Sequence, residues 1–170
     1  MSVDILQREE DIERLIHPVD LIEYVANLQE WNFERTGDDE IAVAHAGHWA
    51  NYHISFAWMD SFQALHFACA FDVKANNKRV GELARLLASV NEQLLMGHFD
   101  YWEGESAVMY RHSLLLAGGA EITEEQIGML HSNAIETCEA YYQAFQAVLW
   151  SGMKAEKALE FAMFETVGEA

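Results

Sequence analysis

Six side chains that could carry acid–base or charge chemistry lie within residues 97–112, in the sequence GHFDYWEGESAVMYRH. They are His98, Asp100, Tyr101, Trp102, Arg111 and His112. A carboxylate, imidazoles, a phenol and a guanidinium are groups from which many active sites are built. Whether they form one site depends on which of them share a face of the local structure.

The alternation of apolar and polar residues predicts that this stretch is a β-hairpin with a loop centred on residues 104–105. In this register Trp102 lies opposite Ala107, and Asp100 lies diagonally across from Arg111, within reach of a charge pair. The side chains expected on the core side are Phe99, Tyr101, Val108, Tyr110 and His112. The side chains expected on the opposite face are His98, Asp100, Trp102 and Arg111.

A longer hairpin is predicted upstream, from HWANYHISFAWM and FQALHFACAFD, and it divides in the same way. One face is apolar, whereas the other carries His53 and His66 among alanines and serine. With Asp60 and Ser61 as a two-residue turn, His66 lies opposite Ser55 and diagonal to His53. Because small side chains allow another backbone to approach closely, we expect that face to be covered by a helix or by a second subunit.

The sharpest enzyme hypothesis is a metal site on this face, because imidazole and carboxylate ligands suffice for zinc or iron. Its ligands would be drawn from His53, His66, His98 and Asp100. They would come from separate strands with no local motif, so structural or interface histidines are the favoured interpretation. The sequence GESAV around Ser106 departs from the nucleophile-elbow pattern and falls in a strand–strand turn. We therefore assign no catalytic, cofactor-binding or metal-binding residue and predict that the chain is not an enzyme.

Charge limits the classes of partner. The 170 residues contain 10 Lys and Arg against 28 Asp and Glu, a formal net charge of −18. Such a field repels phosphate backbones and anionic lipids, which disfavours nucleic-acid and membrane-surface roles but not binding to basic or amphipathic protein segments. No apolar run is long enough for a membrane span, and the acidic start lacks signal-peptide features, so we expect a cytoplasmic protein. Cys69 and Cys138 lie in apolar segments and are predicted to be reduced core residues.

The elements that must position these residues follow from periodicity. Residues 1–16 are predicted to be an acidic N-terminal helical arm, and residues 17–170 a single domain. Helices are expected over residues 18–30, 78–96 and 154–165, and a long helix is expected to begin after Thr123, where Thr123 and Gln126 form a capping box. Strands are expected at residues 31–35 and 40–45 and in the two hairpins. The apolar stripe of the last helix needs a surface, on this domain or on another chain. This order predicts an α+β fold, an antiparallel sheet of hairpins with helices packed on it.

The pattern resembles the YbjN family, bacterial domains often labelled sensory transduction regulators. The segments that carry the resemblance are HPVDLIEYV, WNFERTGDDEIAV, LHFACAFD, VNEQLLMGHFDYW, YRHSLLLAGG and AFQAVLWSGMKAEKALEFAMFETVGEA, which span roughly residues 17–170. The resemblance implies a fold like that of type III secretion chaperones, a curved antiparallel sheet with helices packed against it, often as a dimer. The family offers no catalytic residues to transfer.

We therefore expect a non-enzymatic regulatory or chaperone-like domain, homodimeric, that recognises a segment of an unidentified protein partner with a sheet face, a sheet edge or a groove between helices. The candidate partner-binding residues are His53, His66, His98, Asp100, Trp102 and Arg111. The alternative is a small metal- or ligand-binding enzyme that uses the histidine-bearing face. A regulator acting on nucleic acid ranks last because it conflicts with the charge.

Overall fold

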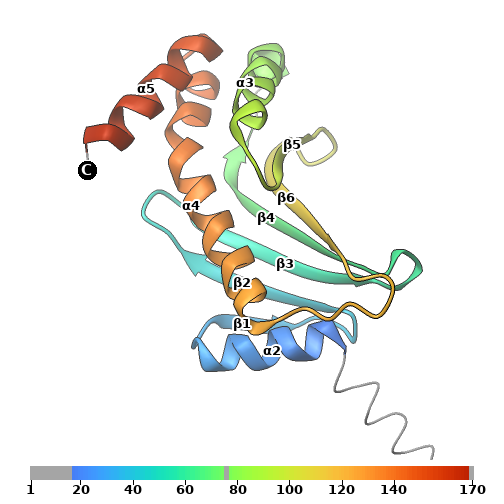
Figure 1. The fold of residues 1–170 in the computed structure, drawn as a ribbon. Coiled ribbons are helices and arrows are strands. Elements are labelled where there is room, and N and C mark those ends of the chain that lie inside the picture. Colours follow the sequence, from blue (N-terminus) through green and yellow to red (C-terminus); the bar gives the residue numbers. More distant parts are fainter. Residues whose placement is uncertain (1–16, 75–76, 169–170) are drawn as a thin grey trace, which may run out of the picture.

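The computed structural model describes residues 17–74 and 77–168 and shows one antiparallel sheet with helices packed against it (Figure 1). The six strands are β1 (Asn32–Arg35), β2 (Glu40–Ala46), β3 (Asn51–Met59), β4 (Ala64–Lys74), β5 (His98–Trp102) and β6 (Ala107–Leu115), in the order β1-β2-β3-β4-β6-β5. The helices in these residues are α2 (Pro18–Leu28), α3 (Val80–Gln93), α4 (Glu124–Leu149) and α5 (Ala155–Gly168). The α+β class predicted from the sequence is confirmed. The predicted arm, residues 1–16, lies outside the described residues.

One face of the sheet forms the core together with the helices. Its side chains are almost fully buried and include Ile41, Val43, Tyr52, Ile54, Phe56, Leu65, Phe67, Cys69, Phe99, Val108 and Tyr110. Aromatic rings interlock across this face, with centroids 4.9 Å apart for Phe56 and Phe67 and 5.0 Å apart for Phe99 and Phe145 of α4. Edge-to-face packing of this kind adds to the free energy gained by burying the rings.

The other face, which we call the open face, carries side chains that are exposed or half-buried, apart from the buried Met109. Its central residues are Ala42, Ala44, His53, Ser55, Ala57, Ala64, His66, Ala68, Ala70, Met109 and Arg111. Among the described residues no helix lies over it. The expected covering helix is therefore absent from this part of the chain, because the helices all pack on the larger apolar side chains of the core face.

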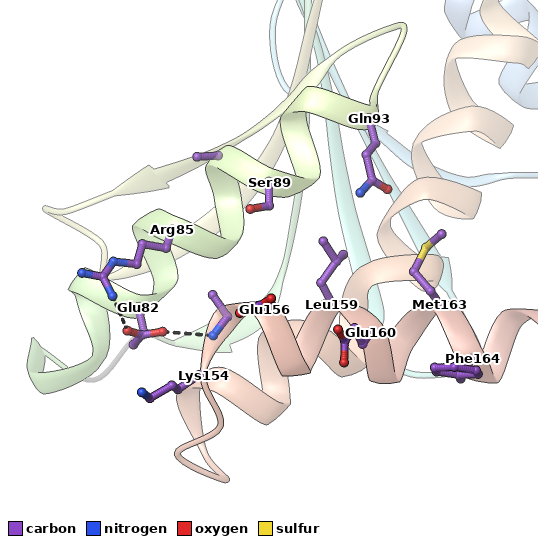
Figure 2. A pocket seen from close by; sticks show the side chains of 12 residues that line it. Glu82, Arg85, Ser89, Gln93, Lys154, Glu156, Leu159, Glu160, Met163 and Phe164 are labelled. Atoms are coloured by element: carbon purple, nitrogen blue, oxygen red, sulfur yellow. Dashed lines mark hydrogen bonds and ion pairs between the residues drawn. The ribbon is translucent and has the colours of Figure 1, made fainter.

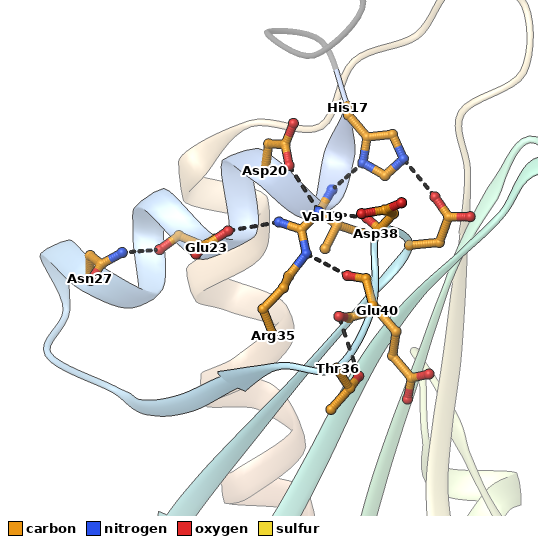
Figure 3. A network of polar contacts seen from close by, with 11 residues as sticks. His17, Val19, Asp20, Glu23, Asn27, Arg35, Thr36, Asp38 and Glu40 are labelled. Carbon is orange, nitrogen blue, oxygen red and sulfur yellow. Dashed lines mark hydrogen bonds and ion pairs between the residues drawn. The ribbon is translucent and has the colours of Figure 1, made fainter.

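Helix α2 is tied to the β1–β2 turn by a network around Arg35 (Figure 3). The Arg35 guanidinium lies 2.9 Å from the Asp20 carboxylate and 2.7 Å from that of Glu23, both on α2, and its Nε donates to the Gly37 carbonyl. At the start of α2, His17 Nδ1 accepts a hydrogen bond from the backbone N–H of Val19. The network fixes the angle at which α2 presents its buried face to β2.

Helix α4 spans the core face and is fixed at both ends. The predicted capping box is confirmed: Thr123 Oγ1 accepts from the Gln126 N–H, and Gln126 Oε1 accepts from the Thr123 N–H. At its other end the Arg79 guanidinium donates to the carbonyls of Val148 and Met153, which satisfies acceptors that a helix C-terminus leaves open. None of the helices in residues 17–74 and 77–168 combines the length and apolar composition needed to cross a membrane.

The two cysteines meet in the middle of this packing. Cys69 of β4 and Cys138 of α4 are both fully buried and free, with their sulfur atoms 3.9 Å apart. Burial raises the pKa of the Cys138 thiol well above its ordinary value, which keeps it protonated. The prediction that both lie in the core is confirmed, and their reduced state stays a prediction.

Candidate functional site

A polar cluster lies on the open face where β4, β6 and β5 run side by side. Arg111 of β6 is at its centre: Nη1 donates to Asp100 Oδ2 of β5 at 2.7 Å, and Nε donates to His66 Nε2 of β4 at 3.2 Å. His98 Nε2 lies 3.3 Å from the same Asp100 oxygen. The Arg111 guanidinium also stands 5.6 Å from the ring centre of Trp102, within cation–π range.

The cluster follows from the hairpin register that the sequence predicted. Trp102 pairs with Ala107 and His98 pairs with Arg111, as the alternation required. The diagonal Asp100–Arg111 pair is therefore confirmed. Tyr101 and His112, in contrast, lie on the core side, so the apparent six-residue site of residues 97–112 divides between two faces.

The charges in this cluster compensate each other. Burial by itself would raise the pKa of Asp100, but the Arg111 hydrogen bond and the nearby His98 outweigh it and hold that pKa below its ordinary value. Burial, followed by the nearby Arg111 and His98, lowers the pKa of His66. Its lowered pKa keeps His66 neutral at pH 7, so its Nε2 can accept the Arg111 hydrogen bond.

His53 does not belong to the cluster, and the register predicted for the long hairpin is wrong. His66 pairs with Ala57, not with Ser55, and His53 pairs with Ala70. The two histidines are therefore four residues apart along the ladder, or about 13 Å at 3.3 Å per residue. The cause is the turn: a 3₁₀ helix over Asp60–Phe62 followed by Gln63 in the left-handed region replaces the expected two-residue turn.

This longer turn keeps every residue on its predicted face, because the shift is by two residues and side chains alternate with period two. It separates the histidine pair on which the metal hypothesis depended. Among the described residues no group of three or more His, Cys, Asp or Glu side chains is placed to hold a metal ion.

A hollow of about 550 Å³ adjoins the cluster at one end of the open face. It is lined by Met59, Phe62, Ala64, His66, Arg111, Ser113 and Leu115. Phe62 and Leu115 are 69% and 68% exposed, unusual values for such large apolar side chains. The hollow is thus apolar at the rim and polar where it meets Arg111.

Comparison with known families shows to which family this chain belongs. Residues 18–147, more than half of the chain, match the family model described as "YbjN: Putative bacterial sensory transduction regulator". The chain belongs to the YbjN family. No curated protein matches this YbjN-family sequence.

Two solved structures resemble the fold of this YbjN-family chain. E. coli YbjN, described as "a putative transcription regulator", matches with a TM-score of 0.53 and 13% identity, over 86% of this chain and 93% of that one. A chain from the ExsC-ExsE complex matches with a TM-score of 0.46 and 12% identity, over 76% and 90% of the two chains. At such identities the likeness concerns the fold alone.

Sequence reasoning missed the apolar hollow of this YbjN domain. Leu115 had a signal, because it continues the alternation of Arg111 and Ser113 on the open face. Phe62 had none, because its position depends on the 3₁₀ turn. That turn is held by tertiary structure, since the Leu116 N–H donates to the Gln63 carbonyl at 2.8 Å.

The β5 edge of the sheet is partly closed to strand addition. The Asn91 side chain of α3 donates to the Phe99 carbonyl at 3.0 Å and accepts from the Phe99 N–H at 2.7 Å. A strand added at this edge would have to displace both hydrogen bonds. The geometry therefore favours the open face over this edge as a binding surface.

The last helix leaves a second surface on the YbjN domain. α5 buries Ala155, Ala158 and Ala162 against its own domain, whereas Phe161 and Phe164 stay 44% and 79% exposed, so its apolar stripe is covered only in part. A groove of about 980 Å³ remains between α3 and α5 (Figure 2). Glu82 of α3 closes one end, since its carboxylate accepts from the Ala155 N–H and pairs with Arg85.

Proposed function

We propose that this chain is a non-enzymatic regulatory domain that binds a segment of a protein partner on its open face. The observation that carries the proposal is the exposed apolar rim, formed by Met59, Phe62 and Leu115, on a sheet face with no described helix over it. An exposed apolar patch with a polar border is typical of protein-interaction surfaces.

The rest of the open face supports the same function. Alanines on β2, β3 and β4 leave the backbone accessible, so an extended or helical segment could approach closely. The cluster of His66, His98, Asp100 and Arg111 supplies hydrogen-bonding groups beside the apolar rim. Of the six residues proposed from the sequence, five lie together in or beside this cluster, whereas His53 lies on the same face but apart from the cluster.

Charge indicates which segment would bind. The chain carries −18 overall, and on the open face Asp100 is already neutralised by Arg111, whereas Glu34 on β1 and Glu40 on β2 lie toward the opposite edge of the sheet. A segment with one or two large apolar side chains and flanking Lys or Arg would complement this surface.

The test is affinity capture from the native cell with three immobilised proteins: the natural chain, Leu115→Glu, and Leu95→Glu as the matched control. Leu95 is 97% exposed and lies outside the open face, after α3. We expect at least one protein to be retained by the natural chain and the control and lost from Leu115→Glu. Equal retention by all three proteins would contradict binding at the open face.

We further propose that the chain is a homodimer. Sedimentation velocity over a wide range of protein concentration tests this part independently of any partner. A dimer, or a monomer–dimer equilibrium that shifts with concentration, is expected. A monomer at every concentration would contradict the dimer while leaving the partner proposal standing.

A further inference from the structure

A second hollow lies at the far end of the long hairpin. Its volume is about 500 Å³, and it forms where β3 begins and β4 ends, beside the C-terminus of α4. It is lined by Trp49, Ala50, Asn51, His53, Ala70, Phe71, Asp72, Tyr142 and Trp150. Eight residues of β3 separate Asn51 here from Met59 at the first hollow, about 26 Å at 3.3 Å per residue, so the two hollows are distinct.

Two tryptophans give this hollow its character. Trp49 is 41% exposed and Trp150 is 61% exposed, although indole rings are normally buried on average. Tyr142, buried beside Phe71 with ring centroids 6.1 Å apart, adds a third aromatic ring to the lining. Aromatic faces carry negative potential, so aromatic rings that line a hollow can attract cations.

The polar lining has the matching sign. Asp72 supplies an exposed carboxylate, and the lining contains neither Lys nor Arg. Neither a hydrogen bond nor an ion pair to Asp72 is found within the described residues. An anion would meet a carboxylate without a compensating cation, whereas a cation would meet the carboxylate and the rings together.

The fold holds the backbone of both tryptophans by specific contacts. The backbone N–H of Trp49 donates to the Glu139 carboxylate of α4 at 3.2 Å. The turn that carries Trp49 is closed by a hydrogen bond from the Gly47 N–H to the Ala50 carbonyl. A Cβ at Gly47 would overlap both the Tyr52 ring and the Glu139 carboxylate, so this turn packs against α4 as only glycine allows.

Trp150 is fixed from the other side. Its N–H donates to the Gln146 carbonyl at 2.8 Å, which makes it the residue that ends α4. The adjoining segment is held by Arg79, whose guanidinium donates to the carbonyls of Val148 and Met153. The backbone that carries both tryptophans is therefore held in place, which reduces the entropic cost of binding.

We propose that the hollow formed by Trp49, Trp150 and Asp72 is a binding site for a cationic group, an alkylammonium or a guanidinium. The rings would contact the cation by cation–π attraction, and Asp72 would neutralise its charge. The net charge of −18 raises the local concentration of any cation near the surface. The group could belong to a small free cation or to a Lys or Arg side chain of a protein, and the experiment separates these sources.

The experiment follows indole N–H signals by NMR at about 0.15 M salt, where long-range attraction is screened. One probe is choline, and its control is 3,3-dimethylbutan-1-ol, which has the same shape without the charge. The other probe is a short Gly-Ser peptide with one arginine, and its control is the same peptide with citrulline. We expect saturable shifts of the Trp49 and Trp150 signals with at least one charged probe and not with its neutral control.

Variants locate the site. Trp150→Ala and Asp72→Asn, both at exposed positions, should each weaken binding of the charged probe tenfold or more. Tyr24→Ala, an exposed aromatic residue on α2 outside both hollows, is the control and should leave binding unchanged. Binding by choline assigns the site to free cations, and binding by the arginine peptide alone assigns it to a protein side chain.

Three results would overturn the proposal: no saturable shift with either charged probe, equal binding of the neutral controls, or equal weakening by Tyr24→Ala. Each of them is separable from the function proposed for the open face, because Leu115→Glu does not touch this hollow.

Discussion

The two faces of one sheet show how the same strands serve two purposes. On β4, Phe67 and Cys69 point into the core and are almost fully buried, whereas His66, Ala68 and Ala70 alternate with them on the open face and stay half-buried. The core face is filled by rings and branched side chains that exclude water. The open face combines small residues, a compensated charge cluster and an apolar rim, a composition that would suit a partner that binds reversibly. The period-two alternation of the chain thus separates the side chains that stabilise the core from those of the proposed binding surface.

The largest expected effect separates the faces by stability. Phe67→Ala removes a ring packed on Phe56 and should lower the free energy of unfolding by about 3–5 kcal/mol, because a cavity remains in the core. Phe62→Ala removes the same ring from the exposed rim of the open face and should change it by less than about 0.5 kcal/mol. Urea denaturation of the two variants measures both. Comparable losses would show that the open face is part of the folded core.

A smaller effect is expected on the pH dependence of folding stability. Burial, with a contribution from His45, lowers the pKa of His131 to about 4; its ring stacks on Trp31, and its Nε2 has no hydrogen-bond partner in the described structure. The unfolded chain binds a proton at His131 more readily than the folded chain does. The free energy of unfolding is therefore fully present above the ordinary histidine pKa and falls by about 3 kcal/mol as pH drops from about 6.5 to 4.

His131→Phe keeps a ring against Trp31 and removes the titration. The difference in unfolding free energy between this variant and the natural chain should change by that amount over the same pH range. Denaturant unfolding at a series of pH values measures it, and parallel curves for the two proteins would contradict it. The subtraction removes the acid sensitivity that both proteins share, including that of Asp100 on the open face.

Loss of hydrogen bonds to a buried core residue should also cost more folding free energy than loss of one on the open face. Asn91→Ala removes two hydrogen bonds to Phe99, a buried core residue, and should cost about 1–3 kcal/mol. Ser55→Ala removes one hydrogen bond to the exposed Glu40 carboxylate on the open face and should cost less than about 0.5 kcal/mol. Hydrogen exchange of the β5 and β6 amides should rise only in the first variant.

A small stability effect is also expected within the polar cluster. Arg111→Gln should cost less than about 1 kcal/mol, because the pair with Asp100 is partly exposed. The pKa of Asp100 should nevertheless rise, since it loses the hydrogen bond that lowers it. Carbon NMR titration of the Asp100 carboxyl measures this, with Arg85→Gln as a control that removes an exposed ion pair elsewhere. An unchanged Asp100 pKa would mean that Arg111 does not organise the cluster.

The hairpin of residues 97–112 could be predicted in detail because both its loop and its alternation are local. The long hairpin could not, although its alternation is equally clear. Its turn contains Gln63 with a φ of 47°, a conformation that the sequence DSFQ does not signal, and the N–H of Leu116, the residue after β6, stabilises it. Both faces were therefore predicted correctly, whereas the pairing of His53 and His66 was not.

By itself the sequence determined the class of fold, the order of helices and hairpins, the face that each residue of a strand takes and the diagonal Asp100–Arg111 pair. These follow from local periodicity and short loops. Only the tertiary structure decided the strand order, the register of the long hairpin, the open face and the two hollows. They depend on contacts between residues far apart in the chain, such as Trp49 with Glu139 and Gln63 with Leu116, whose free energy no local pattern encodes.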